Sequence, residues 1–345
     1  MNLKISVALA SYNGAEYIRE QLDSLNAQSY LPYELIITDD GSTDDTLETV
    51  NQFIKSALFK VSVIQNEERL GWKDNFLKAA SLCSGDLIAF CDQDDLWLPN
   101  KLEIMSKEFT NPNVMLATHT LTVCDSKLKP IAIQDQGIKK TQLLPPLHKA
   151  HSPYFGLTLL FRRSLLEIGN LSERLPSLGQ ATSGCPHDQW LSFLGNVFGY
   201  TSDLNIPLVN YRQHGKNSVG YNDGSELRDT RKLWLDDPLL ILNSDVNFFE
   251  ARAKVCENIS LRTLNSDIKN QAMLGHSFFS HLADISRKRI ELLKTTNIFK
   301  RFLFFYLMLQ NGNYLPNNRQ GIGWKNALKD LIISVLRLNA ILKNK

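Results

Sequence analysis

The sequence lacks the features that define several classes of protein. Its five cysteines are odd in number and widely spaced, and no two form a CxxC pair, so neither a disulfide framework nor a zinc site is indicated. The most apolar run, residues 302–309, is far shorter than the roughly 20 residues that a bilayer-spanning helix needs. Internal repeats and low-complexity tracts are also absent. A disulfide-rich scaffold, a membrane-spanning protein and a solenoid are therefore excluded.

The amino terminus shows no charged leader, long apolar segment or cleavage site, so we expect no export. Together with the unpaired cysteines, this predicts a cytoplasmic location. With 43% apolar and 21% charged residues, the composition is typical of a soluble globular enzyme, and 345 residues suffice for two domains.

Charge is distributed unevenly along the chain. Residues 287–345 contain twelve lysines and arginines and two acidic residues, a net +10, which leaves −8 for residues 1–286. A basic tail on an acidic body indicates an anionic partner for the tail, either a membrane surface or a nucleic acid.

Strand-like and helix-like segments alternate through the first 125 residues, which predicts an α/β fold with a mostly parallel sheet covered by helices. The expected strands are residues 4–10, 33–38, 60–65, 86–91 and 114–123. Residues 125–153 favour a long loop or an inserted hairpin, and a strand at 157–161, a helix at 187–198 and a strand at 206–211 are expected after it. Strand signals end near Tyr221. We therefore predict a catalytic domain at residues 1–222 and a basic helical module at residues 223–345.

Polar residues gather where three of the expected strands end, at residues 11–14, 38–42 and 92–95. Ligands of open α/β sheets bind outside the carboxyl ends of the strands, and clustered carboxylates repel, so folding alone explains this pattern poorly. Asp92 and Asp94 form a DxD pair that can present oxygens to Mg²⁺ or Mn²⁺. Such a cation would in turn bind diphosphate oxygens and stabilise the charge of a leaving group.

The segments ISVALASYNGAEYIREQL, LIITDDGSTDDT and DLIAFCDQDDLWLPNKLE together resemble glycosyltransferase family 2, the inverting GT-A type, over roughly residues 3–220. The segments DQDDLWLPNKL, CPHDQW and YRQHGKNSVG are similar to a bacterial rhamnosyltransferase-like subgroup that builds surface polysaccharides such as O-antigen and capsule.

The resemblance implies roles for residues at the strand ends. It assigns nucleotide binding to Tyr12 and Asp40, with Ala10 in the same pocket and Asp92 alongside. It assigns metal binding to Asp94 above all, together with Asp92.

Residues later in the chain receive roles from the same resemblance. Asp188, in CPHDQW, occupies the position of the catalytic base, although His187 stands where the family commonly has Glu. His187 and Arg212 are expected to contact the diphosphate or the acceptor, and His214 to complete the metal shell.

The resemblance thus implies a metal-dependent enzyme that transfers a sugar from a nucleoside diphosphate donor, dTDP-rhamnose or a UDP-hexose, to a hydroxyl of a saccharide acceptor. A lipid-linked acceptor at the inner face of the cell membrane is expected. Two alternatives stay open. One is a nucleotidyltransferase, although SYNGAEY lacks the glycine-rich, basic phosphate loop that it would need; the other is a noncatalytic saccharide- or nucleotide-binding module.

In the tail, apolar residues recur at helical spacing from Trp324 to Leu342, with basic residues elsewhere on the helix. We expect an amphipathic helix that lies on an anionic membrane, which makes the protein peripheral at that membrane, and we expect no nucleic-acid partner. Packing into a helical bundle or self-association into a homo-oligomer is the alternative for this segment.

Overall fold

The computed structural model describes residues 3–150, 154–177, 180–215, 217, 220–221, 234–316 and 321–337. The chain divides into two compact units. Met1–Pro146, His151–Arg174 and Gly184–Tyr221 form the amino-terminal unit, and Leu147–Ala150, Leu175–Ser183 and Asn222–Lys345 form the helical unit.

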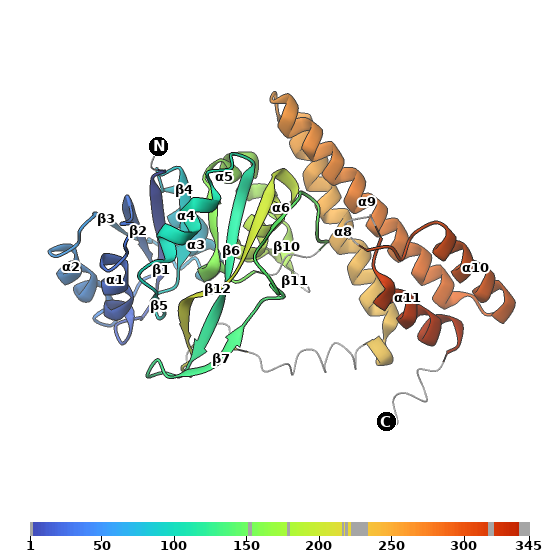
Figure 1. Ribbon diagram of the computed structural model, residues 1–345, viewed down its shortest axis with the longest axis horizontal. Coiled ribbons are helices and arrows are strands. Elements are labelled where there is room, and N and C mark those ends of the chain that lie inside the picture. The colour runs from blue at the N-terminus through green and yellow to red at the C-terminus, as the bar shows by residue number, and fades with distance from the viewer. Residues whose placement is uncertain are drawn as a thin grey trace. The chain divides into compact units, whose positions relative to one another are not determined.

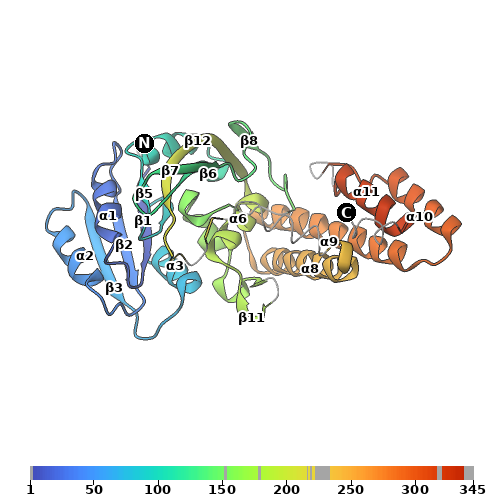
Figure 2. The same cartoon turned by 90° about the horizontal axis from the view of Figure 1, so that it is seen from below.

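The amino-terminal unit begins with four parallel strands in the order β3-β2-β1-β4. They are β1 (Ile5–Ser11), β2 (Glu34–Asp39), β3 (Lys60–Gln65) and β4 (Leu87–Cys91). The connecting helices are α1 (Ile18–Asn26), α2 (Thr46–Ile54) and α3 (Trp72–Ser81). Figure 2 shows α1 and α2 on one face of these strands and α3 on the other. Strands covered on both faces read as continuous apolar runs, and all five residues of β4 are buried.

Beyond β4 the sheet is mixed, and its full order is β3-β2-β1-β4-β9-β6-β12-β5, with β7 on β6 and β8 on β12. These strands are β5 (Leu96–Trp97), β6 (Val114–Cys124), β7 (Pro130–Gln134), β8 (Gln142–Leu144), β9 (Leu160–Arg162) and β12 (Tyr200–Arg212). The helices are α4 (Lys101–Glu108), η1 (Gly156–Thr158), α5 (Ser164–Ile168), η2 (Leu171–Glu173) and α6 (His187–Phe198). A separate two-stranded sheet pairs β10 (Pro176–Ser177) with β11 (Gln180–Gly184).

The predicted fold class, an α/β sheet with a helical carboxyl-terminal region, is confirmed, and α6 matches its predicted bounds. The expected hairpin after residue 125 is present, because β7 turns back antiparallel on β6. The expected strand at 206–211 begins earlier, at Tyr200, because its first half pairs with β6, a partner that local sequence does not reveal.

The topology brings the predicted site residues together. β1 lies between β2 and β4, all three parallel, with Ser11 opposite Asp39 and Leu9 opposite Cys91. The polar segments that follow these strands therefore meet at one edge of the sheet, as the rule for ligand sites in α/β sheets requires.

The helical unit contains α8 (Pro238–Arg262) and α9 (Ser266–Lys294), which run side by side as a long hairpin (Figure 1). α10 (Ile298–Gln310), α11 (Trp324–Asp330) and the π-helical turn η4 (Leu331–Val335) follow. Asp237, Asn265 and Asn297 cap α8, α9 and α10 by accepting backbone amides, which fixes where each helix begins. Among the described residues, no helix is both long and apolar enough to cross a membrane.

The predicted amphipathic helix from Trp324 to Leu342 is interrupted. It leaves α-helical geometry after Asp330, and its apolar residues divide between two environments, since Trp324 and Leu328 are exposed whereas Val335 is fully buried. Leu338 and Leu342 lie outside the described residues.

Candidate active site

Gln93, the middle residue of Asp92-Gln93-Asp94, joins the segments that follow β1 and β4. Its Oε1 accepts the Tyr12 amide at 3.0 Å, and its Nε2 donates to the Tyr12 carbonyl at 3.1 Å. A Cβ on Gly14 would lie 2.2 Å from Gln93 Oε1, so the clamp requires glycine there. Sequence reasoning missed Gln93 because it considered only the carboxylates on either side.

The Tyr12 ring is covered by the guanidinium of Arg69, whose Cζ lies 3.9 Å from the ring centroid. Arg69 comes from the loop between β3 and α3, and a planar cation over a phenol is a cation–π arrangement. Ala10, near the end of β1, is half-buried and lies opposite Thr38 of β2. Nucleotide binding by Tyr12 and Ala10 stays a prediction.

Asp40 holds the loop that carries Arg69. Its carboxylate accepts hydrogen bonds from Asn66 Nδ2 at 2.9 Å and from the amides of Leu70 and Gly71, each at 2.7 Å. Three donors satisfy this buried carboxylate and hold the loop around it. The structure thus gives Asp40 an internal role, and its contact with a nucleotide stays a prediction.

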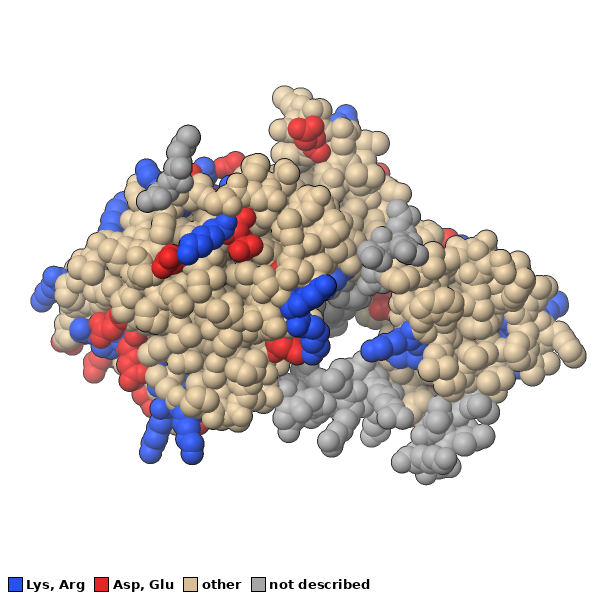
Figure 3. Space-filling model, viewed as in Figure 1, with Lys and Arg blue, Asp and Glu red and all other residues tan. Residues whose placement is uncertain are grey.

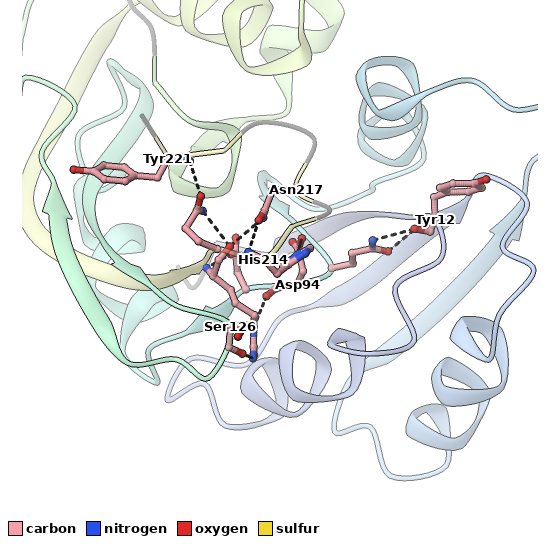
Figure 4. Close-up of polar contacts among 10 residues, drawn as sticks. Tyr12, Asp94, Ser126, His214, Asn217 and Tyr221 are labelled. Carbon is pink, nitrogen blue, oxygen red and sulfur yellow. Dashed lines mark hydrogen bonds and ion pairs between the residues drawn. The ribbon is translucent and has the colours of Figure 1, made fainter. Parts of the chain in front are cut away.

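Asp94 and His214, 120 positions apart in the sequence, are in contact, with His214 Nε2 2.8 Å from Asp94 Oδ2 (Figure 4). The Tyr17 ring packs against the His214 ring at a centroid distance of 4.6 Å. Asn217 Oδ1 accepts the His214 amide at 2.6 Å, which fixes the backbone beside the ring.

Arg212 binds the loop that contains Asp94 and Asp95. Its amide donates to Asp95 Oδ1 at 3.0 Å, its Nε to the Asp94 carbonyl at 2.9 Å, and one terminal nitrogen to the Ser126 carbonyl at 2.9 Å (Figure 4). The other terminal nitrogen pairs with Glu20. The buried guanidinium is thus used to hold the chain, and its predicted contact with a diphosphate or an acceptor stays a prediction.

The carboxylates of this loop repel one another. Burial raises the pKa of Asp92 and of Asp95, and the neighbouring Asp94 carboxylate raises both further. A divalent cation would relieve this repulsion. Among the described residues, no three His, Cys, Asp or Glu side chains are grouped as a complete metal site. One or two carboxylates are nevertheless a normal protein contribution for Mg²⁺ when substrate phosphates supply the other ligands, so Asp94 with Asp92 fits such an ion. Metal binding by His214 stays a prediction.

Asp188 lies in the first turn of α6. Its carboxylate accepts the Gln189 amide at 2.7 Å and the Gly156 amide. Burial raises the pKa of Asp188 to about 6, and its charge contributes to the raised pKa of Asp92, which places the two carboxylates within electrostatic reach of each other. A carboxylate whose pKa lies near neutrality is suited to accept a proton.

His187, by contrast, packs among aromatic rings. Its ring stacks on Phe76 at 4.1 Å and meets Phe90 edge-on at 4.6 Å. Burial lowers the pKa of His187 to about 3, so the ring is neutral at physiological pH. Neither ring nitrogen has a hydrogen-bond partner among the described residues. The surroundings are those of a packing residue, and ligand contact by His187 stays a prediction.

Comparisons with known proteins agree with this geometry. Residues 6–169 match the model of glycosyl transferase family 2. An uncharacterized glycosyltransferase of Nostoc sp. is 32% identical over 63% of this chain and 66% of its own length. The dTDP-rhamnosyl transferase RfbG of Shigella flexneri is 29% identical over 62% of this chain and 74% of its own. The chain spans slightly less than two thirds of the Nostoc relative.

Two further proteins bear on the fold and the chemistry. The UDP-Glc:alpha-D-GlcNAc-diphosphoundecaprenol beta-1,3-glucosyltransferase WfgD of Escherichia coli is 33% identical over 32% of this chain and 42% of its own length. The crystal structure of S. aureus TarS 1–349 in complex with UDP superposes with a TM-score of 0.52 and 18% identity, over 83% of this chain and 92% of that one. At this identity, the likeness to TarS shows the fold alone.

The fold and these matches agree on a GT-A-like domain that is similar in sequence to glycosyltransferases. The region that is similar to glycosyl transferase family 2, residues 6–169, contains Tyr12, Asp40, Asp92 and Asp94.

Proposed function

We propose that this protein is an inverting glycosyltransferase that moves a sugar from a nucleoside diphosphate donor to a hydroxyl of a saccharide acceptor. The observation that carries the proposal is Asp188, whose half-buried carboxylate accepts the Gln189 and Gly156 amides, has a pKa of about 6 and lies within electrostatic reach of Asp92 at the sheet edge. A base near the carboxylates that would hold the diphosphate-binding metal ion is the arrangement that a single in-line displacement needs.

In this reaction Asp188 accepts the proton of the acceptor hydroxyl. The hydroxyl oxygen forms a bond to the anomeric carbon on the face opposite the diphosphate, the bond from that carbon to the diphosphate oxygen breaks, and the diphosphate leaves with the electron pair. The anomeric configuration inverts. Tyr12, Asp40 and Ala10 select the nucleotide, and Arg212 holds Asp94 and Asp95 in place.

The proposed reaction includes a divalent cation, Mn²⁺ or Mg²⁺. Asp94 and Asp92 would hold it, with His214 as a third ligand. When bound, such an ion stabilises the negative charge that develops on the departing diphosphate.

For the donor we propose dTDP-rhamnose or a UDP-hexose, and for the acceptor a lipid-linked saccharide of bacterial surface polysaccharide synthesis. The name of RfbG states a dTDP-rhamnosyl transfer, and that of WfgD states UDP-glucose as donor and a diphosphoundecaprenol-linked acceptor.

A donor panel tests the proposal. dTDP-rhamnose, UDP-glucose and UDP-GlcNAc should be added singly, with and without Mn²⁺, and thermal stabilisation and release of the nucleoside diphosphate measured. A ligand that binds only the folded state raises the melting temperature, so we expect stabilisation by one donor, dependent on the metal. Asp94→Ala should abolish both effects, whereas Asp23→Ala, an exposed partner of Arg19 on α1, should abolish neither.

Three results would contradict the proposal. If no nucleotide sugar stabilises or reacts, the chain is not such an enzyme. Release of pyrophosphate from a nucleoside triphosphate would instead support the nucleotidyltransferase alternative. Full activity after exhaustive chelation would remove the metal from the proposal.

We further propose that the helical unit binds an anionic membrane surface, which makes the protein peripheral at the inner face of the cell membrane. On α10, Phe299, Phe302, Leu303, Tyr306 and Leu307 follow helical spacing and are exposed, Phe299 by 81% and Leu303 by 60%. Uncharged residues dominate the surface over α10 that Figure 3 shows.

The charge around this apolar face favours lipid over a neutral protein partner. Residues 295–337 contain six basic residues and one acidic residue, Asp330, which is buried and paired with Arg289. Four of the basic residues are exposed in the structure: Lys300, Lys325, Lys329 and Arg337. An apolar helix face in a basic segment complements a bilayer with anionic headgroups. A soluble protein rarely leaves such a face uncovered.

A further inference from the structure

Lys101, the first residue of α4, is completely buried. Its Nζ donates to the Leu157 carbonyl at 2.6 Å and lies 3.5 Å from the centroid of the Trp97 ring. Taking an ammonium group out of water is costly, and replacing a buried charge by a well-packed apolar group is often neutral or stabilising. Stability of the fold alone is therefore a poor reason for a lysine at this position.

Leu157 is the middle residue of η1 (Gly156–Thr158), and this turn contacts the base directly. The Gly156 amide donates to the Asp188 carboxylate. The turn also packs tightly against the start of α6, because a Cβ on Gly156 would lie 2.4 Å from His187 Nε2. One three-residue turn thus connects the Lys101 ammonium to the Asp188 carboxylate.

The surroundings of Lys101 include both signs of charge. Burial lowers the pKa of Lys101 to about 7, and nearby acidic groups oppose this effect. The titratable groups that interact with it are Cys91, Asp92 and Asp95 at the end of β4 and in the following loop, and His119 of β6.

We infer that Lys101 is a positioning residue, which holds η1 so that the Gly156 amide orients and stabilises the Asp188 carboxylate for proton transfer. This inference rests on the proposed function, since it assigns Lys101 to the base of that reaction. Lys101 lies in PNKLE, a segment that is part of the family resemblance. The inference gives this segment a function beside Asp188, the base that acts on the acceptor.

The test compares three variants of the full chain. Lys101→Met removes the charge and the donor, Lys101→Gln keeps a donor without the charge, and Lys107→Met is the matched control, an exposed lysine of α4 that pairs with Glu103. The rate of nucleoside diphosphate release from the donor that stabilises the wild type should be measured across pH, along with thermal stabilisation by that donor.

We expect Lys101→Met to lower the rate by roughly 10- to 100-fold, as for a misplaced catalytic group, while stabilisation by the donor is unchanged. Loss of the Gly156 contact should also move the acid limb of the pH–rate profile, set by Asp188, to higher pH, because a carboxylate with fewer amide donors binds its proton more tightly. Lys101→Gln should restore most of the rate, and Lys107→Met should match the wild type. A purely structural role would change the melting temperature but not the acid limb.

The inference is overturned if Lys101→Met folds and keeps the wild-type rate and acid limb, or if Lys101→Gln folds and is as slow as the methionine variant. If Lys101→Met does not fold, the test depends on Lys101→Gln alone. A tenfold or larger loss of rate in that variant would overturn the inference, because the variant keeps a donor for the Leu157 carbonyl. Failure of the proposed function is distinguishable, because the wild type would then release no nucleoside diphosphate from any donor.

Discussion

At the scale of single residues, the environment of Asp188 determines what it can do. The carboxylate is ionised only above a pKa of about 6, so a base at this position predicts a rate that falls as pH decreases through 6. Burial that raises a carboxyl pKa also means that the folded state binds its proton more tightly than the unfolded chain does. The stability that this proton contributes is present below about pH 4 and lost as pH rises through 6.

We predict that Asp188→Asn lowers sugar transfer by about 10²- to 10⁴-fold, equivalent to about 3 to 5 kcal/mol, because the amide cannot accept the acceptor proton. Donor binding should be nearly unchanged, since the base acts on the acceptor, and stability at pH 7 should not decrease. Single-turnover transfer rates and melting temperatures measure both effects. Retention of full transfer by a folded Asp188→Asn variant would mean that another group is the base.

At the scale of secondary-structure elements, a buried ion pair joins α9 to α11. Arg289 donates to the two carboxylate oxygens of Asp330 at 2.7 and 3.0 Å, and the Tyr314 hydroxyl donates to Asp330 at 2.8 Å. Removing one partner of a buried pair leaves the other charge without compensation, which costs far more than the pair contributes.

Asp330→Ala should therefore destabilise the helical unit by about 3 to 5 kcal/mol. Glu257→Ala, which removes the exposed pair with Lys254 on α8, should cost less than about 1 kcal/mol. Hydrogen exchange resolved by segment, combined with urea unfolding, measures both variants. Equal and small effects would show that the Arg289 charge finds another partner.

At the scale of the whole molecule, net charge is distributed unevenly, with +10 in residues 287–345 and −8 in residues 1–286. This distribution predicts that the protein binds anionic vesicles. Each basic residue near the surface contributes about 1 kcal/mol, and salt screens this attraction. The full chain should bind vesicles of phosphatidylcholine and phosphatidylglycerol more tightly than pure phosphatidylcholine, and less tightly at high salt.

The apolar face of α10 makes this prediction specific. Phe299→Glu with Leu303→Glu should abolish vesicle binding, whereas Leu261→Glu with Leu264→Glu, at exposed positions where α8 meets α9, should leave it intact. Cosedimentation measures binding, and sedimentation velocity measures the oligomeric state. If the α10 variant binds vesicles normally but dissociates a wild-type oligomer, the face is a self-association surface.

The local sequence determined the alternation of strands and helices and the edge of the sheet at which polar residues gather. Both follow from short-range physics, since apolar runs such as that of β4 must be buried and polar residues gather where those strands end. The start of α6, with Asp188 in its first turn, was likewise readable from helical spacing.

Only the tertiary structure decided how these residues are used. The contact between Asp94 and His214 spans 120 positions, the clamp of Gln93 on Tyr12 spans 81, and Lys101 reaches η1 across 56. The burial of Lys101, Arg212 and His187 and the exposure of α10 are likewise set by segments remote in sequence. Burial and long-range contact depend on which surfaces the folded chain covers, and the periodicity of one segment carries no information about the segment that covers it.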